Sequence, residues 1–270
     1  MYLQETNLKI LELLKRFKYL SSSQLIKLGV ASSQPATSRI LQRFFKNKDE
    51  VIKSPLINKL TFQPHPTRGK LENLYCLNKR GALFLSEYLD KDLSEIEYVK
   101  GSGFFAKDYF HRVTQIDYHI NLYLQSQKEG FTIDFFYNYF DKTGSNNSNS
   151  NQRLEAKTKI VYEDGSFFIP DGIYKITKTI SDGTKQQFYY ILEIHKGNDT
   201  KRAIETIEKN IKALVDGCIA KKHNYKYSHR VVMIFDSETI KISVLKRLNN
   251  IKKFTEFKDY FLLYKMSIQV

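Results

Sequence analysis

Two acidic residues that could act together lie on two neighbouring predicted strands. Asp171 follows Pro170, and Glu193 lies 22 residues later in the run Leu192-Glu193-Ile194-His195-Lys196. Carboxylate and imidazole groups bind cations and transfer protons in proteins, and an ammonium group stabilises negative charge, so this run has the side chains for such chemistry. The strands, predicted over about 166–177 and 186–195, flank a turn signal at 181–184 and form a hairpin.

The length of the hairpin loop decides whether the two carboxylates meet. A two-residue loop at 182–183 pairs residues whose numbers sum to 365, so Asp171 would lie opposite Ile194, and Glu193 would point to the other face. A three-residue loop at 181–183 gives pairs that sum to 364 and sets Asp171 opposite Glu193, with Cβ atoms about 5 Å apart. Gly183 suits the left-handed third position of such a loop. The sequence therefore favours the second register, with His195 on the same face.

These residues resemble the PD-(D/E)XK motif of restriction-endonuclease-like folds. The resemblance implies that Asp171 and Glu193 bind Mg²⁺, and that a lysine two residues after the glutamate activates water or stabilises charge. In this chain that position is His195, and the lysine is displaced to Lys196, on the opposite face of the strand. Imidazole replaces a permanently cationic ammonium poorly, so we expect weak or absent cleavage. The alternative is that Asp171 ends a strand and that Glu193 and His195 are ordinary exposed strand positions.

The N-terminal part of the chain has the periodicity of three short helices. Apolar residues recur at helical spacing over 6–20, and a second helix runs from the serines at 21–23 to a stop at Gly29. A third helix restarts at 31–33, tolerates Pro35 in its first turn and continues to about 46. Three helices joined by short turns match a helix-turn-helix.

A strand at 51–57, a polar loop at 63–70 and a strand at 74–77 are predicted next, before a closing helix that begins near 81. The run from Tyr75 to Leu85 resembles the wing-exit strand and closing helix of many bacterial winged-helix proteins. We therefore predict a winged helix-turn-helix domain over residues 1–90.

The third helix has a polar, cationic face that suits duplex DNA. Polar and basic side chains can bind base edges and phosphates in the major groove, and the wing adds two cations near His65. The DNA-binding candidates are Ser33, Gln34, Pro35, Ser38, Arg39, Gln42, Arg43 and Lys46 on the helix, and Arg68 and Lys70 on the wing.

The net charge of +14 is concentrated in the same region. Residues 1–80 hold 15 Lys and Arg against 5 Asp and Glu, whereas residues 81–270 hold 28 against 24. Such an excess favours a polyanionic partner, because neutralised phosphates release counterions.

The rest of the chain predicts a second domain of α/β type. A linker is expected at 91–105, and a domain with a mixed sheet at 106–270 with a flexible loop at 142–151. Besides the hairpin, the pattern indicates helices at 106–128, 200–220 and 237–249, and strands at 131–140, 231–235 and 261–268. The fold class is therefore α+β, a winged helix followed by a restriction-endonuclease-like domain.

Several classes of protein are disfavoured. No apolar run is long enough to span a membrane, and the first residues lack the order of a signal peptide. No P-loop motif is present, and Cys76 and Cys218 match no metal-ligand spacing. We expect a cytoplasmic protein with reduced cysteines.

The order of motifs also resembles the replication-relaxation family of plasmid and mobile-element proteins. The matching positions are His111 on a helix, Pro170-Asp171, Glu193, and Lys209 on a later helix, whereas His195 departs from an acidic residue. The resemblance implies a DNA-binding protein in replication control or mobilisation, with a degenerate nuclease-like domain and, as partners, a second copy or a replication or transfer protein. A Mg²⁺-dependent endonuclease and a transcriptional repressor remain alternatives.

Overall fold

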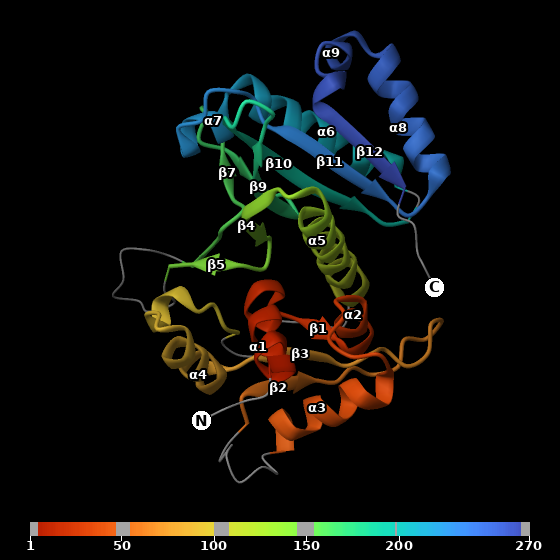
Figure 1. Cartoon of the computed structure of the whole chain (residues 1–270). Helices are drawn as coiled ribbons and strands as arrows, with labels where there is room; N and C mark the ends of the chain where they lie inside the picture. Colours follow the sequence, from red (N-terminus) through yellow and green to blue (C-terminus); the bar gives the residue numbers. More distant parts are fainter. Residues whose placement is uncertain (1–4, 47–54, 100–107, 145–153, 198, 266–270) are drawn as a thin grey trace. The chain divides into compact units, whose positions relative to one another are not determined.

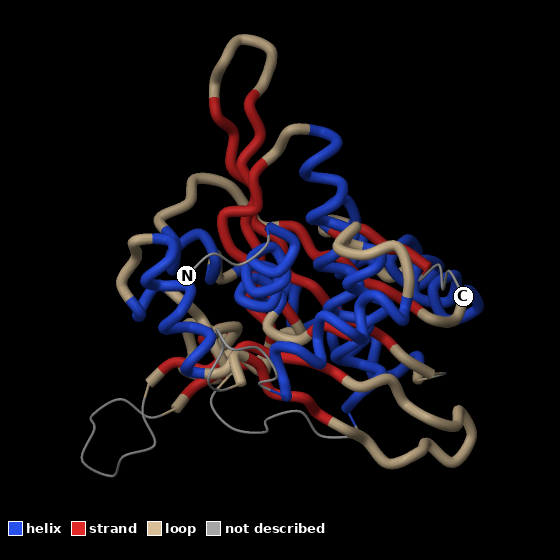
Figure 2. The backbone as a smooth tube through the Cα atoms, turned by 60° about the horizontal axis from the view of Figure 1, so that its bottom comes forward, coloured by secondary structure: helices blue, strands red, loops and turns tan. Residues whose placement is uncertain are grey.

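The computed structural model describes residues 5–46, 55–99, 108–144, 154–197 and 199–265. The chain divides into two compact units, residues 1–124 and residues 125–270 (Figure 1). Helices and strands occur in both units, as the backbone coloured by secondary structure shows (Figure 2). The larger sheet has both parallel and antiparallel pairs, which confirms the α+β class and the mixed sheet.

The first unit combines a small antiparallel sheet with several helices. The sheet has the order β1-β3-β2, with β1 and β2 each antiparallel to β3. Its elements are α1 (Glu5–Phe17), β1 (Leu20–Ser21), α2 (Ser22–Lys27), α3 (Gln34–Lys46), β2 (Ile57–Leu60), β3 (Leu74–Leu77), α4 (Lys79–Leu89), the 3-10 turn η1 (Leu93–Glu95) and the first part of α5 (Tyr109–Glu129).

Local sequence explains where these helices begin and end. Ser21 caps α2 in a capping box, in which its hydroxyl accepts from the Gln24 N–H and the Gln24 side chain accepts from the Ser21 N–H. Gly29 follows α2 with φ +70°, a conformation that glycine adopts without strain. The apolar stripe of α1 is buried in the core together with Leu25, Leu41 and Leu74. The three predicted helices are therefore confirmed.

Two predictions about the first unit are wrong. The strand expected at 51–57 is β2, displaced to Ile57–Leu60, and residues 51–54 lie outside the described part. Residues 91–99 do not form an open linker, because Ile96 is buried and the Val99 N–H donates to the Leu77 carbonyl. Residues 100–105 are outside the description, and the two units divide within α5, after Leu124.

The second unit is built on a five-stranded sheet of order β12-β11-β10-β9-β4. Strands β4, β9 and β10 are antiparallel, and β10, β11 and β12 are parallel, with α6 and α8 as the connections. The elements are β4 (Thr132–Asn138), β5 (Lys142–Thr143), β6 (Glu155–Ala156), β7 (Ile160–Val161), β8 (Phe167–Phe168), β9 (Gly172–Thr179), β10 (Lys185–His195), α6 (Thr200–Val215), α7 (Cys218–His223), β11 (Arg230–Phe235), α8 (Glu238–Asn250), α9 (Lys252–Thr255), η3 (Lys258–Tyr260) and β12 (Phe261–Lys265).

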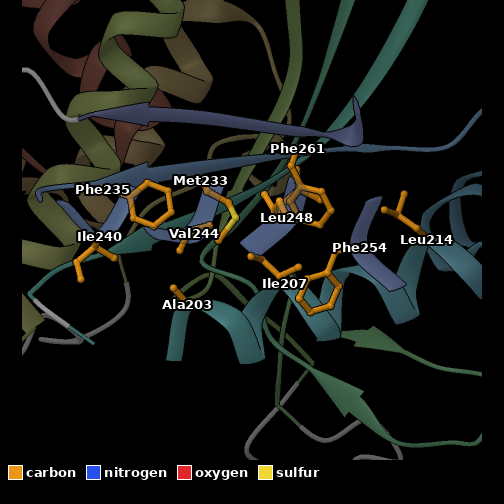
Figure 3. Packing of buried hydrophobic residues seen from close by; sticks show 11 residues of the cluster. Ala203, Ile207, Leu214, Met233, Phe235, Ile240, Val244, Leu248, Phe254 and Phe261 are labelled. Atoms are coloured by element: carbon orange, nitrogen blue, oxygen red, sulfur yellow. The ribbon is translucent and has the colours of Figure 1, made fainter. Parts of the chain in front are cut away.

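A hydrophobic cluster fixes α6 and α8 against one face of β11 (Figure 3). Alternate residues of β11, Val231, Met233 and Phe235, face this cluster, as the two-residue period of a strand requires. Ile207 and Val244 contribute from α6 and α8, and both are fully buried. Because α6 is held on this face, its polar residues are held beside the end of β10.

The β9–β10 hairpin has the register that the sequence favoured. Lys185 pairs with Thr179 and Leu192 with Gly172, so paired residue numbers sum to 364. Ile180 and Thr184 close a loop of three residues, and Gly183 has φ +82°. This prediction is confirmed.

The loop expected at 142–151 is wrong at its start, because Lys142 and Thr143 form β5, which pairs with β6. Residues 145–151 lie outside the described part.

None of the helices described is long and apolar enough to cross a bilayer. Neither cysteine forms a disulfide, and burial raises the pKa of the Cys76 thiol to about 12.

Candidate functional site

A polar cavity of about 540 Å³ lies in the second unit, beside the end of β10. Strands β8 and β10, the turn before β9, and the first turns of α6 supply its walls. The lining residues are Phe167, Phe168, Ile169, Asp171, Glu193, Ile194, His195, Asp199, Lys201, Arg202, Glu205, Thr206 and Lys209. The cavity therefore brings Asp171, Glu193 and His195 together, with Lys209 from α6.

The backbone of the hairpin and one side chain of α6 position the two carboxylates. Asp171 precedes β9 directly, and its Oδ2 accepts from the Ile194 N–H at 2.7 Å. Glu193 is buried and its Oε1 accepts from the Asn210 side-chain amide at 3.2 Å, which in turn donates to the Thr206 carbonyl at 2.9 Å. One oxygen of each carboxylate is thus fixed by the fold.

Glu193 resists ionisation in this environment. Burial raises the pKa of Glu193 well above its usual range, and the nearby Asp171 carboxylate raises it further. The hydrogen bond from Asn210 and the positive charge of Lys209 act in the opposite direction. A cation bound between the two carboxylates would relieve the repulsion between them.

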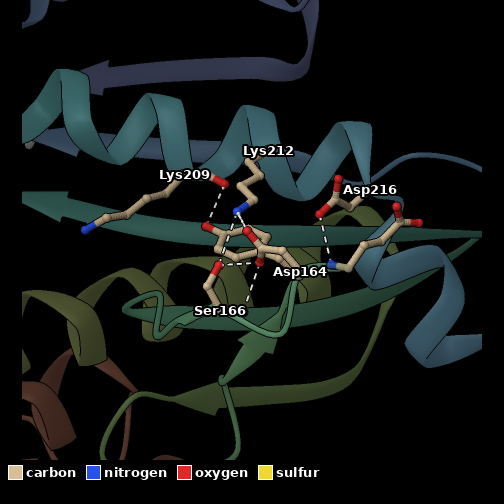
Figure 4. Close-up of polar contacts among 7 residues, drawn as sticks. Asp164, Ser166, Lys209, Lys212 and Asp216 are labelled. Carbon is tan, nitrogen blue, oxygen red and sulfur yellow. Dashed lines mark hydrogen bonds and ion pairs between the residues drawn. The ribbon is translucent and has the colours of Figure 1, made fainter.

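Cationic side chains of α6 border the cavity. Lys201, Arg202 and Lys209 are exposed and form no ion pair within the described residues. The Lys209 carbonyl accepts from the Tyr162 hydroxyl at 3.0 Å, and the Lys209 side chain extends away from the cluster of Asp164, Ser166 and Lys212 (Figure 4). Lys212 donates to Asp164 at 2.5 Å and, together with the hydrogen bonds that Ser166 donates, lowers the pKa of that carboxyl to about 2. The charge of Lys212 is therefore paired with Asp164, whereas the Lys209 ammonium is available to bind an anion in the cavity.

The other predicted catalytic positions differ in their placement. His195 is buried and its ring stacks on Phe235, with the centroids 5.2 Å apart. Lys196 follows β10 and does not line the cavity. His111 lies on α5 within residues 1–124, whereas the cavity is formed by residues of the second unit.

The sequence reasoning missed Asn210 and the polar residues at the start of α6. Asn210 is fully buried and occupies the apolar stripe formed by Ala203, Ile207 and Leu214. A buried amide in such a stripe needs a polar partner, so the break in the apolar period was a usable signal. Arg202, Thr206 and Lys209 also follow helical spacing, which places them on one side of α6.

The first unit presents the helix face that the sequence singled out. Thr37, Leu41 and Phe44 of α3 are buried, whereas Arg39 and Gln42 are exposed. Gln34 and Pro35 are exposed in the first turn of α3, Ser33 is exposed just before it, and Ser38 is partly exposed. The side chains of Arg43 and Lys46 lie outside the description. The division between the two faces is thus confirmed for the side chains that are described.

The loop between β2 and β3 is shaped by contacts within the first unit. His65 and Gly69 exchange backbone hydrogen bonds of 2.7 and 2.9 Å and close a tight turn that carries Arg68. The Arg68 guanidinium lies 4.3 Å from the ring centroid of Phe110, while the Arg68 side chain stays exposed. Lys70 is exposed and makes no ion pair within the residues described. Both cations are accessible to an anionic partner.

Within the described ranges, no group of three or more His, Cys, Asp or Glu residues is arranged to hold a metal ion. No protein family model, curated protein or solved structure matches this chain.

Proposed function

We propose that this chain is a duplex DNA-binding protein whose first unit is a winged helix-turn-helix domain. In this proposal α2 and α3 form the helix-turn-helix, α3 enters the major groove, and the loop at 61–73 is the wing. The antiparallel order β1-β3-β2 and the tight turn at His65–Gly69 support the assignment. On the resemblance to the replication-relaxation family, we assign the protein to a plasmid or mobile element, in replication control or mobilisation.

The observation that carries the proposal is the two-sided character of α3. Thr37, Leu41 and Phe44 anchor the helix in the core, so Arg39 and Gln42 are held outward. Arginine can pair with guanine N7 and O6, and glutamine can bind an adenine edge. The net charge of +10 over residues 1–80 supplies attraction to phosphates of any sequence.

The test is a binding measurement with the full-length chain. Duplexes enriched by the protein from a random-sequence pool serve as probes, because the natural site is unknown. Each lost base contact costs roughly 1 to 3 kcal/mol, so Arg39→Ala with Gln42→Ala is expected to weaken binding at least about 30-fold. Lys9→Ala, at an exposed position of α1, is the matched control and leaves specific binding unchanged. Enrichment of no duplex by the wild-type chain would refute the proposal.

A second candidate function is Mg²⁺-dependent cleavage of DNA, and the confirmed 364 register favours it. The paired residues end at Gly172 and Leu192, and the same register continued by one residue would set Asp171 opposite Glu193. Both carboxylates line the cavity, together with Lys209. Mg²⁺ prefers oxygen ligands and is commonly bound by one or two carboxylates together with substrate phosphates, so the residues present fit this ion. Bound there, Mg²⁺ would polarise the scissile phosphate and lower the pKa of a water molecule.

The protein residues have separate tasks in this reaction. Asp171 and Glu193 would hold the ion, with the Ile194 N–H and Asn210 fixing their orientation. Lys209 would stabilise the negative charge of the phosphate, in place of the motif lysine that is His195 here. Lys201 and Arg202 would bind the neighbouring backbone phosphates.

Cleavage of a labelled plasmid in the presence and absence of Mg²⁺ tests this second candidate. Asp171→Asn and Lys209→Gln should each abolish whatever cleavage the wild-type chain shows. Asp259→Asn removes an exposed carboxylate of the same unit outside the cavity and should leave cleavage unchanged. Cleavage that persists in Asp171→Asn would refute the assignment of this cavity as the cleavage site. A wild-type chain that never cleaves would refute this second candidate function.

A further inference from the structure

A continuous row of aromatic rings runs along one part of the second unit, from β4 past β10 to the segment before β11. Successive ring centroids are 4.6 to 5.8 Å apart. The members of this aromatic row, in order, are Tyr137, Phe135, His223, Tyr189, Tyr225 and Tyr227. Tyr189 is buried and anchors the row, whereas Tyr227 at its end is 55% exposed.

Cations accompany the aromatic row. Lys157, Lys175 and Lys226 lie over the rings of Tyr137, Tyr189 and Tyr227, at 4.8, 5.7 and 5.6 Å from the centroids. The segment 221–230 carries His223, Tyr225 and Tyr227 of the row, and it holds four Lys and Arg and no acidic residue. Lys175 pairs with Asp134, so the cations of the segment 221–230 are the ones of interest. Rings together with an excess of positive charge suit a ligand that has both flat aromatic groups and negative charge.

Two of the four cations of this segment are held by the protein, and two are available. Lys221 pairs with Glu163, and Lys222 donates to the Lys159 carbonyl. Lys226 and Arg230 are exposed and form no ion pair in the described part of the chain. Tyr225 is fixed by its hydroxyl, which donates to the Gln187 carbonyl at 2.7 Å. The fold therefore holds Tyr225 in place, while Lys226 and Arg230 face solvent.

We propose that the aromatic row and the segment 221–230 bind single-stranded nucleic acid. Bases of a duplex are stacked on one another, so the exposed ring of Tyr227 with cations beside it matches unpaired bases and their phosphates better than a duplex. Tyr227 stacks on a base, and Lys226 and Arg230 bind phosphates. This site lies beyond the proposed function, because it belongs to the second unit and needs no residue of α3.

The site has a defined relation to the carboxylate cavity. Tyr189 and Glu193 are four residues apart on the same face of β10, a separation of about 13 Å along the strand. A single strand on the aromatic row therefore lies on the face of the sheet that also presents Glu193. Strand separation near the cavity would supply such a ligand.

The first test measures binding of the full-length chain to a labelled single-stranded oligonucleotide of mixed sequence by fluorescence anisotropy. Base stacking on an aromatic side chain contributes roughly 1 to 3 kcal/mol, so Tyr227→Leu is expected to weaken binding about 10-fold. Lys226→Gln with Arg230→Gln should flatten the salt dependence by about 1.4 in log–log slope, for two phosphate contacts. The matched controls are Tyr264→Leu, at a tyrosine that is 50% exposed on β12, and Lys246→Gln on α8.

A second readout uses the absence of tryptophan from the chain. Tyr227→Trp introduces a single tryptophan, whose fluorescence the oligonucleotide should quench, whereas Tyr264→Trp should show no change. Equal losses in Tyr227→Leu and Tyr264→Leu, no quenching at position 227, or equal competition by polyglutamate would overturn the inference. If the wild-type chain binds duplexes and does not bind single strands, only this inference is refuted. The variant with Arg39→Ala and Gln42→Ala should lose duplex binding and keep single-strand binding.

Discussion

The two units of this protein hold their candidate functional side chains in opposite ways. In the first unit Arg39, Gln42 and Lys70 are exposed, and the core beneath them is apolar. In the second unit Glu193 is buried next to Asp171, and a hydrogen bond from Asn210 fixes its side chain. An exposed cation stays hydrated, so it takes little from the free energy of folding. A buried carboxyl group close to a second carboxylate, in contrast, loses its proton less readily.

This difference determines what each kind of surface needs from the fold. The face of α3 requires only that one helix be anchored, and the amphipathic period of that helix is sufficient. The cavity requires the β9–β10 register, because a shift by one residue would turn Glu193 to the other face of the sheet. We therefore expect substitutions on the exposed face of α3 to change binding and leave the stability of the fold unchanged. Substitutions in the cavity should change both binding and stability.

The largest effect is expected for Gly81→Ala, at the start of α4. A Cβ atom at this position would lie 2.2 Å from the Leu56 carbonyl oxygen and 2.6 Å from Leu77 Cδ1. The Leu56 carbonyl is held by the Asn78 N–H, so it cannot move aside easily. Overpacking of this kind should lower the free energy of unfolding of the first unit by about 3 kcal/mol.

Thermal unfolding and limited proteolysis check this prediction. The first unit should melt earlier and be cut first, while the second unit keeps its transition. Lys79→Ala, at an exposed position in the same turn of α4, serves as the control and should leave both transitions in place. One shared transition that shifts as a whole would show that the two units do not unfold separately.

The second prediction concerns the pH dependence of the second unit. The pKa of Glu193 is raised above the unfolded value of about 4.5, so the folded state binds this proton more tightly. The stability that protonated Glu193 contributes is fully present below its unfolded pKa, and it is lost as pH rises through its folded pKa. Glu193→Gln should remove this decline and raise the melting temperature at neutral pH.

Added Mg²⁺ sharpens the test of Glu193. The ion binds the ionised carboxylates, so it should stabilise the wild-type second unit more as pH rises, and Glu193→Gln should lose most of this gain. Glu256→Gln, at an exposed position after α9, should behave like the wild type in both titrations. A pH profile of stability that is identical in wild type and Glu193→Gln would contradict the assigned environment.

The features that the sequence predicted well are those set by local rules. The face of α3 followed from the helical period, and the hairpin register followed from Gly183, whose φ of +82° suits a three-residue loop. The serines at 21–23 indicated where the second helix begins, and Ser21 is its N-cap. Each of these depends on a few neighbouring residues, which is why one sequence was sufficient.

The features that were missed depend on tertiary packing. Strand β2 contains exposed Asn58 and Lys59 and gains its order by pairing with β3, so its own residues do not signal a strand. The stretch 91–99 mixes acidic and apolar residues without a clear period, and only the burial of Ile96 and the hydrogen bond from the Val99 N–H to the Leu77 carbonyl show that it packs within the first unit. The resemblance supplied Lys209, but its place in the cavity depends on how α6 packs on β11.

The smallest predicted effect distinguishes the two cations of the loop at 61–73. Each of Arg68→Ala and Lys70→Ala should remove about one phosphate contact and reduce the log–log salt slope by about 0.9 for all duplex sequences. Because Arg68 also lies over the Phe110 ring, Arg68→Ala should additionally lower the stability of the first unit by about 0.5 to 1 kcal/mol. Lys70→Ala should leave stability unchanged.

Anisotropy titrations from 50 to 200 mM salt together with thermal unfolding provide the measurement, and Lys9→Ala is again the control. Unchanged salt slopes in both variants would remove this loop from the DNA interface and leave the exposed face of α3 as the contact surface of the first unit.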